Sequence, residues 1–321
     1  MNDSIIEKVV NELESYGEFA IICHSHPDGD TIGSAFALKY AYPDKDVAVI
    51  CEDEIPERIA FISDGSQTDI PEKKYEKIVS VDCATTFLMG EKTEAKYKYK
   101  TDIKIDHHRT GEDYAEFNCV DAEASAVGEI IYKILKKANR LNKKSCEALY
   151  AAIASDCGCF MYANTTKETH IIASELIEQG INFKKINTLL FESKTKTEIS
   201  ALKLALNGLE YYLDSRLAII TFTNKIKTEN GIVEDDLGAI PSLTREIKGV
   251  ELGVVIKELD GEDGVYKIST RSSDKINCCE VCALFGGGGH IRASGATVRG
   301  KTPDEIKKII IDYARENLSD E

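Results

Sequence analysis

An early segment of the chain concentrates side chains that can bind a metal ion. His24, Asp28 and Asp30 lie within seven residues of one another, between an apolar run at 19–23 and a helical pattern at 35–40. A segment that leaves a strand and enters a helix is where open α/β sheets build their sites. Three ligands do not complete a metal site, and an Asp-Gly-Asp sequence is also common in ordinary turns. The interpretation therefore depends on the rest of the chain.

Further acidic and imidazole side chains follow other apolar runs. Asp82 ends one run, the triplet Asp106-His107-His108 ends the next, and Asp156 follows a helical run. The carboxyl ends of parallel strands meet at one edge of a sheet, so we expect these side chains to converge with the first group. Taken singly, each Asp is a typical turn former and each His a common structural residue. Their convergence would require cations, because the carboxylates would otherwise repel one another strongly.

The donor set indicates the kind of metal and the kind of reaction. Imidazole and carboxylate ligands without thiolate suit Mn²⁺ or a similar divalent ion. The number of ligands predicts two divalent metal ions. Paired ions about 3.5–4 Å apart typically promote displacement at phosphorus by an activated water.

The hydrophobic periodicity predicts an α/β protein whose N-terminal domain holds a mostly parallel sheet covered on both faces. Strands are expected at about 18–23, 46–51, 77–82, 101–106 and 116–120, and helices near 4–15, 31–41, 124–138, 144–155 and 167–179.

The pattern changes after about residue 180. Helical spacing at 181–191 and 198–206 predicts helices that bridge two domains. A smaller α/β unit follows, with strands at about 216–223, 250–258, 265–271 and 295–299, a hairpin turn at 260–264, and helices near 236–247 and 303–317. We therefore expect a first domain over 1–182, a helical connector over 183–212 and a second domain over 213–321.

Composition excludes several classes of protein. The formal net charge of −15 over 321 residues argues against binding of long nucleic acid, but it allows a short phosphorylated ligand. Because no apolar run approaches the length of a membrane span and the N-terminus lacks the features of a signal peptide, we expect a cytoplasmic protein without membrane contact. The ten cysteines lie mostly in apolar runs, and Cys278-Cys279-x-x-Cys282 has no second C-x-x-C motif to complete a zinc site. Reduced, buried thiols are expected.

The motifs, taken in order, resemble those of the DHH phosphoesterase superfamily, named for the triplet at 106–108. The matching residues of the first domain are His24-x-x-x-Asp28-x-Asp30-x-x-Gly33-Ser34, then Asp82, then Asp106-His107-His108, then Asp156. In the second half, Phe285 is followed by four glycines, His290 and Ala293-Ser294-Gly295, similar to the signature of the DHH-associated substrate domain. Two departures are Cys157, where the motif commonly has Thr, and Arg109-Thr-Gly111, which is not diagnostic of a subgroup.

The resemblance implies a role for each residue of the first domain. The implied metal ligands are His24 and Asp28 for one ion, Asp30, His107 and Asp156 for the other, and Asp82 as the bridge. Asp106 would orient an imidazole, and His108 would face the scissile phosphate and stabilise charge or protonate the leaving oxygen. The resemblance assigns no such role to His26 or His170.

The resemblance also implies a second binding site. Arg271 and His290 would hold the end of the substrate that is not cleaved, beside the backbone of Gly287, Gly288 and Gly289. Without the resemblance, the glycine run could equally be a flexible hinge. Weaker candidates for phosphate contact are Arg109, Arg245, Lys275 and Arg292.

Within the superfamily, the two-domain chain resembles the branch that degrades nanoRNA and dephosphorylates nucleotides. The implied activity is hydrolysis of short oligoribonucleotides or dinucleotides to mononucleotides, with 3′-phosphoadenosine 5′-phosphate as a further substrate. Alternatives are a cyclic-dinucleotide phosphodiesterase, a non-catalytic nucleotide-binding regulator and a metal-stabilised structural protein. A family II inorganic pyrophosphatase ranks lower, because it lacks the glycine-rich histidine loop. The sequence leaves open whether the protein is a monomer or a homodimer.

Overall fold

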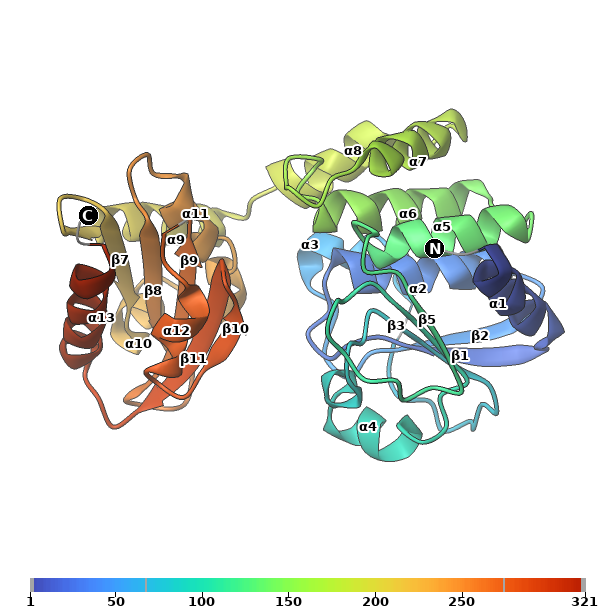
Figure 1. Cartoon of the computed structure of the whole chain (residues 1–321), viewed down its shortest axis with the longest axis horizontal. Helices are drawn as coiled ribbons and strands as arrows, with labels where there is room; N and C mark the ends of the chain where they lie inside the picture. The colour runs from blue at the N-terminus through green and yellow to red at the C-terminus, as the bar shows by residue number, and fades with distance from the viewer. Residues whose placement is uncertain (1–2, 67, 274, 319–321) are drawn as a thin grey trace. The chain divides into compact units, whose positions relative to one another are not determined.

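A computed structural model describes residues 3–66, 68–273 and 275–318. The chain divides into two compact units, the first ending at Ser193 and the second beginning at Lys194 (Figure 1). Helix α8 (Phe183–Asn187) and the π-helical turn η2 (Thr188–Glu192) belong to the first unit, and α9 (Lys196–Asn207) belongs to the second.

The first unit is built on a five-stranded sheet in which every strand pair is parallel. The strand order is β2-β1-β3-β4-β5. The strands are β1 (Glu18–Ile22), β2 (Asp46–Ile50), β3 (Ile78–Val81), β4 (Ile103–Asp106) and β5 (Phe117–Val120). The expected parallel α/β fold is confirmed, and each strand begins and ends within a few residues of its predicted position.

Helices cover both faces of this sheet (Figure 1). The predicted helices are present as α1 (Asp3–Ser15), α2 (Gly29–Ala41), α5 (Val127–Lys137), α6 (Lys143–Asp156) and α7 (Lys167–Glu178). Three short elements that the sequence did not predict are α3 (Glu57–Ala60), the 3₁₀ turn η1 (Thr86–Met89) and α4 (Glu91–Tyr97). Such short helices lack the repeated apolar spacing on which a prediction from periodicity depends.

Successive residues of β1 point to opposite faces of the sheet. Phe19 and Ile21 pack into the larger core beneath α1, α2 and α5. Ala20 and Ile22 point the other way, into a smaller core with Met89. All four strand residues are fully buried, and burial of a large apolar side chain stabilises the fold by about 1.5–3 kcal/mol.

The contact between α2 and α6 determines where the candidate site forms. Two glycines of α2 allow it: a Cβ on Gly33 would lie 2.6 Å from the carbonyl oxygen of Ala148, and a Cβ on Gly29 would lie 2.3 Å from Oγ of Ser155. Because the helices approach so closely, Asp156 at the end of α6 lies beside the start of α2. The motif residue Gly33 is therefore required by packing against the backbone of α6.

The second unit contains a mixed six-stranded sheet in the order β10-β11-β9-β8-β7-β6. Its strands are β6 (Glu210–Tyr212), β7 (Leu217–Phe222), β8 (Leu252–Glu258), β9 (Val265–Ser272), β10 (Gly288–His290) and β11 (Ala293–Arg299). Its further helices are α10 (Asn224–Glu229), α11 (Ile240–Glu246), α12 (Cys278–Ala283) and α13 (Pro303–Asn317). Helices α12 and α13 bury one face of the sheet, and α9 and α11 bury the other. The hairpin between β8 and β9 is confirmed.

One helix of this unit differs from the prediction. The expected helix at 236–247 is a 3₁₀ turn (Glu234–Leu237) followed by the separate helix α11. Pro241 lies in the first turn of α11. Proline has no N–H and a fixed φ, so it favours the start of a helix over its interior. The break before α11 follows from that preference.

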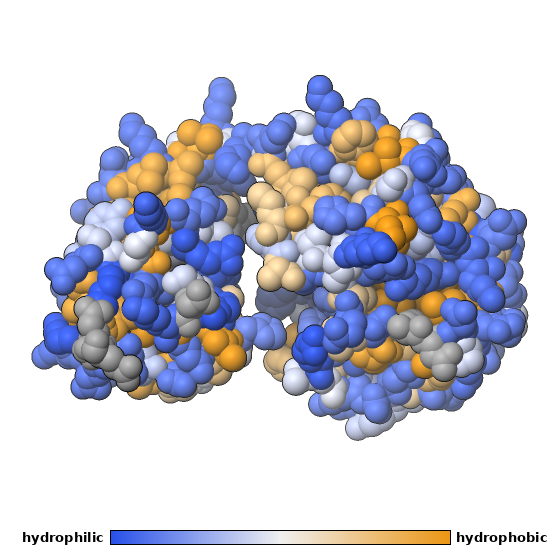
Figure 2. Space-filling model, turned by 45° about the horizontal axis from the view of Figure 1, so that its top comes forward, coloured by the Kyte–Doolittle hydropathy of each residue, from blue (hydrophilic) through white to orange (hydrophobic). Residues whose placement is uncertain are grey.

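The surface and the cysteines agree with the compositional analysis. Hydrophilic side chains dominate the visible face of each unit, interrupted by smaller apolar patches (Figure 2). Across the described residues, no helix combines the length and the apolar character that crossing a bilayer requires. All ten cysteines are free thiols, and those of Cys278 and Cys282 pack inward from α12.

Candidate active site

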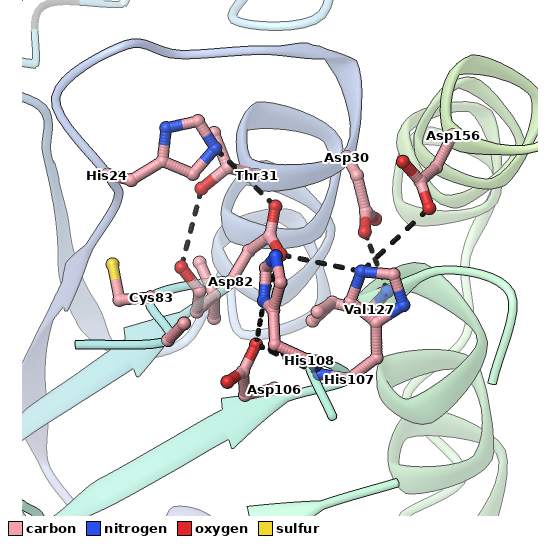
Figure 3. A network of polar contacts seen from close by, with 12 residues as sticks. His24, Asp30, Thr31, Asp82, Cys83, Asp106, His107, His108, Val127 and Asp156 are labelled. Carbon is pink, nitrogen blue, oxygen red and sulfur yellow. Dashed lines mark hydrogen bonds and ion pairs between the residues drawn. The ribbon is translucent and has the colours of Figure 1, made fainter. Parts of the chain in front are cut away.

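The predicted metal-binding side chains of the first unit converge at the carboxyl edge of its sheet (Figure 3). In a sheet of order 2-1-3-4-5, the connections from β1 and β3 leave in opposite directions and create the crevice in which such folds bind ligands. His24 follows β1 and Asp82 follows β3, one on each side of that crevice. The other predicted ligands come from the start of α2, the end of β4 and the end of α6.

The first set of ligand atoms surrounds His24. Its Nε2 lies 3.5 Å from Oδ2 of Asp82 and 3.7 Å from Oδ1 of Asp28. Asp28 caps α2 and accepts hydrogen bonds from the backbone N–H groups of Asp30 and Thr31, both at 3.0 Å. The capping bonds orient a carboxylate that is otherwise exposed. One ligand atom from each of His24, Asp28 and Asp82 lies within 4.8 Å of the others.

Asp30 is buried beneath the N-terminus of α5. It accepts hydrogen bonds from the N–H groups of Val127 (2.7 Å) and Gly128 (3.0 Å) and from Oγ of Ser34 (3.1 Å). The helix N-terminus favours a negative charge. Burial, followed by the charges of neighbouring carboxylates, nevertheless raises the pKa of Asp30 well above its ordinary value. A nearby cation would reverse that effect.

The second set of ligand atoms is centred on His107. Its Nδ1 donates a hydrogen bond to the carbonyl oxygen of Ala124 at 3.1 Å, which leaves Nε2 available as a ligand. Nε2 lies 3.8 Å from Oδ2 of Asp156 and 3.8 Å from Oδ1 of Asp82. Burial raises the pKa of Asp156 to about 6. One ligand atom each from Asp30, His107 and Asp156 again lies within 4.8 Å of the others.

Asp82 lies between the two sets. Its Oδ2 faces His24 and its Oδ1 faces His107. The residue is buried and has a left-handed φ of 58°, which is unfavourable for a residue other than glycine. Among the described residues, Oδ1 has no hydrogen-bond partner, and a buried unpaired oxygen is costly. A divalent cation on each side of Asp82 would satisfy both oxygens, so these residues fit metal ions.

His108 and Asp106 form a pair beside this cluster. Nδ1 of His108 donates to Oδ1 of Asp106 at 2.7 Å, and the backbone N–H of His107 donates to the same oxygen at 2.9 Å. The hydrogen bond to Asp106 raises the pKa of His108. Burial alone would raise the pKa of Asp106, but His108 and Lys104 lower it to about 2. Sequence reasoning did not identify Lys104, which is buried and lies 3.1 Å from Oδ2 of Asp106.

A cavity of about 260 Å³ opens over the cluster. His24, Asp28, Asp82, His107, His108 and Asp156 all line it. Two further lining residues are His26, which the sequence analysis set aside, and Leu88, which it missed. Cys157 does not face this cavity, because its buried sulfur accepts a hydrogen bond from the N–H of Phe160. His170 lies in α7 and stacks on Phe160.

The predicted phosphate-binding residues lie in the second unit. Arg271 is in β9, directly opposite Ala293 of β11, and His290 of β10 pairs with the same Ala293. Gly288 and Gly289 form an edge strand with His290, and Gly287 precedes it. A Cβ on Gly287 would lie 2.3 Å from the carbonyl oxygen of Gly295.

Two of the weaker candidates form ion pairs on the surface. Arg109 forms an ion pair with Glu123 at 2.9 Å, and Lys275 lies 3.5 Å from Glu251.

A parallel α/β sheet with overlapping His and carboxylate sets at its switch point defines a class of metal-dependent hydrolases. Two family comparisons agree with this class: residues 18–153 match the DHH family, N-terminal domain, and residues 217–317 match the DHHA1 domain. The chain belongs to the DHH family and is one of its phosphoesterases. The resemblance found in the sequence motifs is confirmed.

Two relatives and one solved structure cover nearly the whole chain. A probable bifunctional oligoribonuclease and PAP phosphatase NrnA of Streptococcus mutans is 29% identical over 303 residues, covering 90% of this chain and 92% of that protein. The bifunctional oligoribonuclease and PAP phosphatase NrnA of Bacillus subtilis is 26% identical, covering 95% of this chain and 96% of that protein. An exopolyphosphatase-related protein from Bacteroides fragilis shares the fold, with a TM-score of 0.89, 23% identity and coverage of 99% and 98% of the two chains.

Proposed function

We propose that this phosphoesterase hydrolyses short oligoribonucleotides or dinucleotides to mononucleotides. The observation that carries the proposal is Asp82, whose two buried carboxylate oxygens face separate ligand sets in one cavity. The names of the two relatives support the substrate class, because both are described as oligoribonucleases. The same names favour 3′-phosphoadenosine 5′-phosphate as a second substrate.

We further propose that the site holds two divalent cations, with Mn²⁺ the ion best suited to mixed imidazole and carboxylate ligands. Bound there, the cations would supply charge neutralisation at the phosphate and an activated water. His24 and Asp28 would hold one ion, Asp30, His107 and Asp156 would hold the other, and Asp82 would contact both. The capping bonds on Asp28 and the Ala124 carbonyl on His107 orient these ligands before an ion arrives.

The protein's own groups would act on the phosphate through His108. Its Nδ1 is engaged by Asp106, so the imidazole is oriented with Nε2 left for the substrate, and the side chain lines the cavity. A protonated imidazole placed there would stabilise the added negative charge or give a proton to the leaving oxygen. Arg271 and His290, together with the backbone of Gly287 to Gly289, would bind the part of the substrate that is not cleaved.

A substrate panel tests the proposal. Purified protein with Mn²⁺ is given a pApA-type dinucleotide, a long oligonucleotide, 3′-phosphoadenosine 5′-phosphate, cyclic di-AMP and pyrophosphate, and Asp82→Ala is assayed in parallel. We expect rapid turnover of the dinucleotide, slower or no turnover of the long oligonucleotide, and loss of activity in the variant.

Other outcomes would replace the proposal with a defined alternative. Preference for cyclic di-AMP would indicate a cyclic-dinucleotide phosphodiesterase. If none of the five compounds turns over while metal binds, the chain would be a nucleotide-binding regulator. If metal removal lowers the melting temperature of a protein that hydrolyses none of the compounds, the metal would have a structural role.

A further inference from the structure

Lys104 is a buried cation that the proposed chemistry has not used. It lies in β4, two residues before Asp106, so the two side chains point to the same face of the sheet. The side chain of Lys104 is 2% exposed and that of Asp106 is not exposed. Burial of an ammonium group is costly unless oxygen atoms surround it. Such a group in the interior of a parallel sheet therefore needs a physical reason.

Three oxygen atoms surround the ammonium group. Nζ donates hydrogen bonds to the carbonyl oxygens of Ala84 and Glu112, both at 3.0 Å, and lies 3.1 Å from Oδ2 of Asp106. The ring of Tyr114 contributes a cation–π contact at 5.1 Å. The two carbonyl groups belong to the loops that follow β3 and β4, so Nζ is held between two segments of backbone. These contacts hold the ammonium group of Lys104 in place beside Asp106.

The loop after the DHH triplet is shaped to admit this contact. A Cβ on Gly111 would lie 2.7 Å from the carbonyl oxygen of Ala84 and 3.2 Å from Nζ of Lys104. The backbone N–H of Glu112 donates to the same Ala84 carbonyl at 2.9 Å. Gly111, whose role was not evident from the sequence, lets the loop close over the ammonium group.

Asp106 divides its two oxygens between different partners. Oδ1 accepts from Nδ1 of His108 and from the N–H of His107, and Oδ2 faces Lys104. The contact between Oδ2 and Nζ leaves Oδ1 turned toward His108, where it accepts from Nδ1. The geometry links Lys104 to the orientation of an imidazole that lines the cavity.

We propose that Lys104 is a positioning residue for the reaction. Its ammonium group, held by two backbone carbonyls, fixes the carboxylate of Asp106, and Asp106 in turn orients His108 in the cavity lining. The role in the reaction rests on the proposed function, whereas the effect on His108 is a property of the protein alone. The two parts are therefore tested by separate measurements.

The first measurement does not depend on any substrate. The chain has six histidines, so ¹⁵N-labelled imidazoles can be assigned in the metal-free protein. We expect a slowly exchanging Nδ1–H signal from His108 in the wild type, and its loss through rapid exchange in Lys104→Met. The Nδ1–H of His107, which is bonded to the Ala124 carbonyl, provides the internal control and should persist. An unchanged His108 signal in the variant would overturn the proposal.

The second measurement is a double-mutant cycle on kcat and KM with Mn²⁺ and bis(p-nitrophenyl) phosphate, a small diester. We expect Lys104→Met to lower kcat about 10- to 100-fold with little change in KM. In an Asp106→Asn background, Lys104→Met should lower kcat less than about twofold, because the amide no longer provides the carboxylate through which Lys104 acts on His108. Equal losses in both backgrounds would show that Lys104 acts only through general stability.

A control removes a more exposed ion pair that lies just before the same two strands. Lys77 lies 2.7 Å from Asp102, immediately before β3 and β4, at the edge of the sheet opposite the site. Lys77→Met should leave both kcat and the His108 signal unchanged. If the wild type hydrolyses neither this diester nor the pApA-type dinucleotide, the proposed function fails, while the exchange experiment still decides the role of Lys104.

Discussion

Oδ1 of Asp82 lies 3.8 Å from Nε2 of His107, and among the described residues it has no hydrogen-bond partner. Oδ2 of the same carboxylate faces His24 at 3.5 Å. The two carboxylate oxygens thus face different imidazole nitrogens, one in each set of ligands. The left-handed backbone of Asp82 directs the carboxylate between the two sets of ligands. The predictions below follow from this arrangement and from the contacts that support it.

Asp82→Asn is expected to weaken metal binding. The amide keeps the size of the side chain but loses the charge and one acceptor oxygen. We expect apparent Mn²⁺ affinity and phosphodiester hydrolysis to fall by at least about 100-fold. Calorimetric titration with Mn²⁺ measures the affinity. Asp53→Asn is the control, because that exposed carboxylate lies 3.9 Å from His26 outside both ligand sets. Wild-type affinity in Asp82→Asn would contradict a bridging role.

Metal affinity is expected to rise with pH. Burial raises the pKa of Asp156 above its ordinary 3.8 to about 6. Burial lowers the pKa of His24. The neighbouring carboxylates of Asp28 and Asp82 outweigh this effect and raise the pKa of His24 from 6.5 to about 10. Both pKa values are higher in the folded state, so bound protons stabilise the metal-free protein at low pH. That stability is lost as pH rises through about 6 for Asp156 and through about 10 for His24.

Because a metal must displace these protons, Mn²⁺ should bind more tightly at pH 7.5 than at pH 5.5. The gain in melting temperature on adding Mn²⁺ should increase over the same range. Titrations in two buffers of different ionisation enthalpy measure the protons released. An affinity that is independent of pH would contradict protonated ligands in the metal-free protein.

Ser34→Ala tests the support of Asp30. Its hydroxyl provides one of three hydrogen bonds to that carboxylate, and the N–H groups of Val127 and Gly128 remain. We expect a loss of about 1 kcal/mol in the free energy of unfolding and a loss of up to about 10-fold in Mn²⁺ affinity. Denaturant unfolding and calorimetry measure the two effects. Ser15→Ala removes an exposed hydroxyl bonded to Glu12 and should change neither quantity.

Gly33→Ala tests the contact between α2 and α6. Alanine favours a helix by up to about 1 kcal/mol over glycine, but its Cβ would lie 2.6 Å from the backbone oxygen of Ala148. Overpacking costs about 1–3 kcal/mol, so we expect a net loss in the free energy of unfolding. We also expect weaker Mn²⁺ binding, because a displaced α6 would carry Asp156 with it. Gly17→Ala is the control, since nothing lies within 4 Å of its Cβ position. A more stable Gly33→Ala variant would contradict this account.

The elements of the fold could be predicted where a repeating pattern encodes burial. The short apolar runs that became β1 to β5 alternate along the chain with helical patterns, and this alternation predicted a mostly parallel sheet. Short elements such as α4 and β10 lack such a pattern and were missed. The glycine run at 286–289 has no such pattern either, and only its pairing with β11 shows that part of it is an edge strand.

The sequence by itself predicted which residues would carry the chemistry, because carboxylate and imidazole side chains, which are common metal ligands, stand at the ends of its apolar runs. Only the tertiary structure decided how they are grouped. The placement of Asp82 between two sets depends on strand order and on a left-handed backbone. The contact between Lys104 and Asp106 could not be predicted either, since the apolar pattern of β4 does not indicate a buried charge. Such contacts depend on loops that are distant in sequence, and local patterns do not encode long-range pairing.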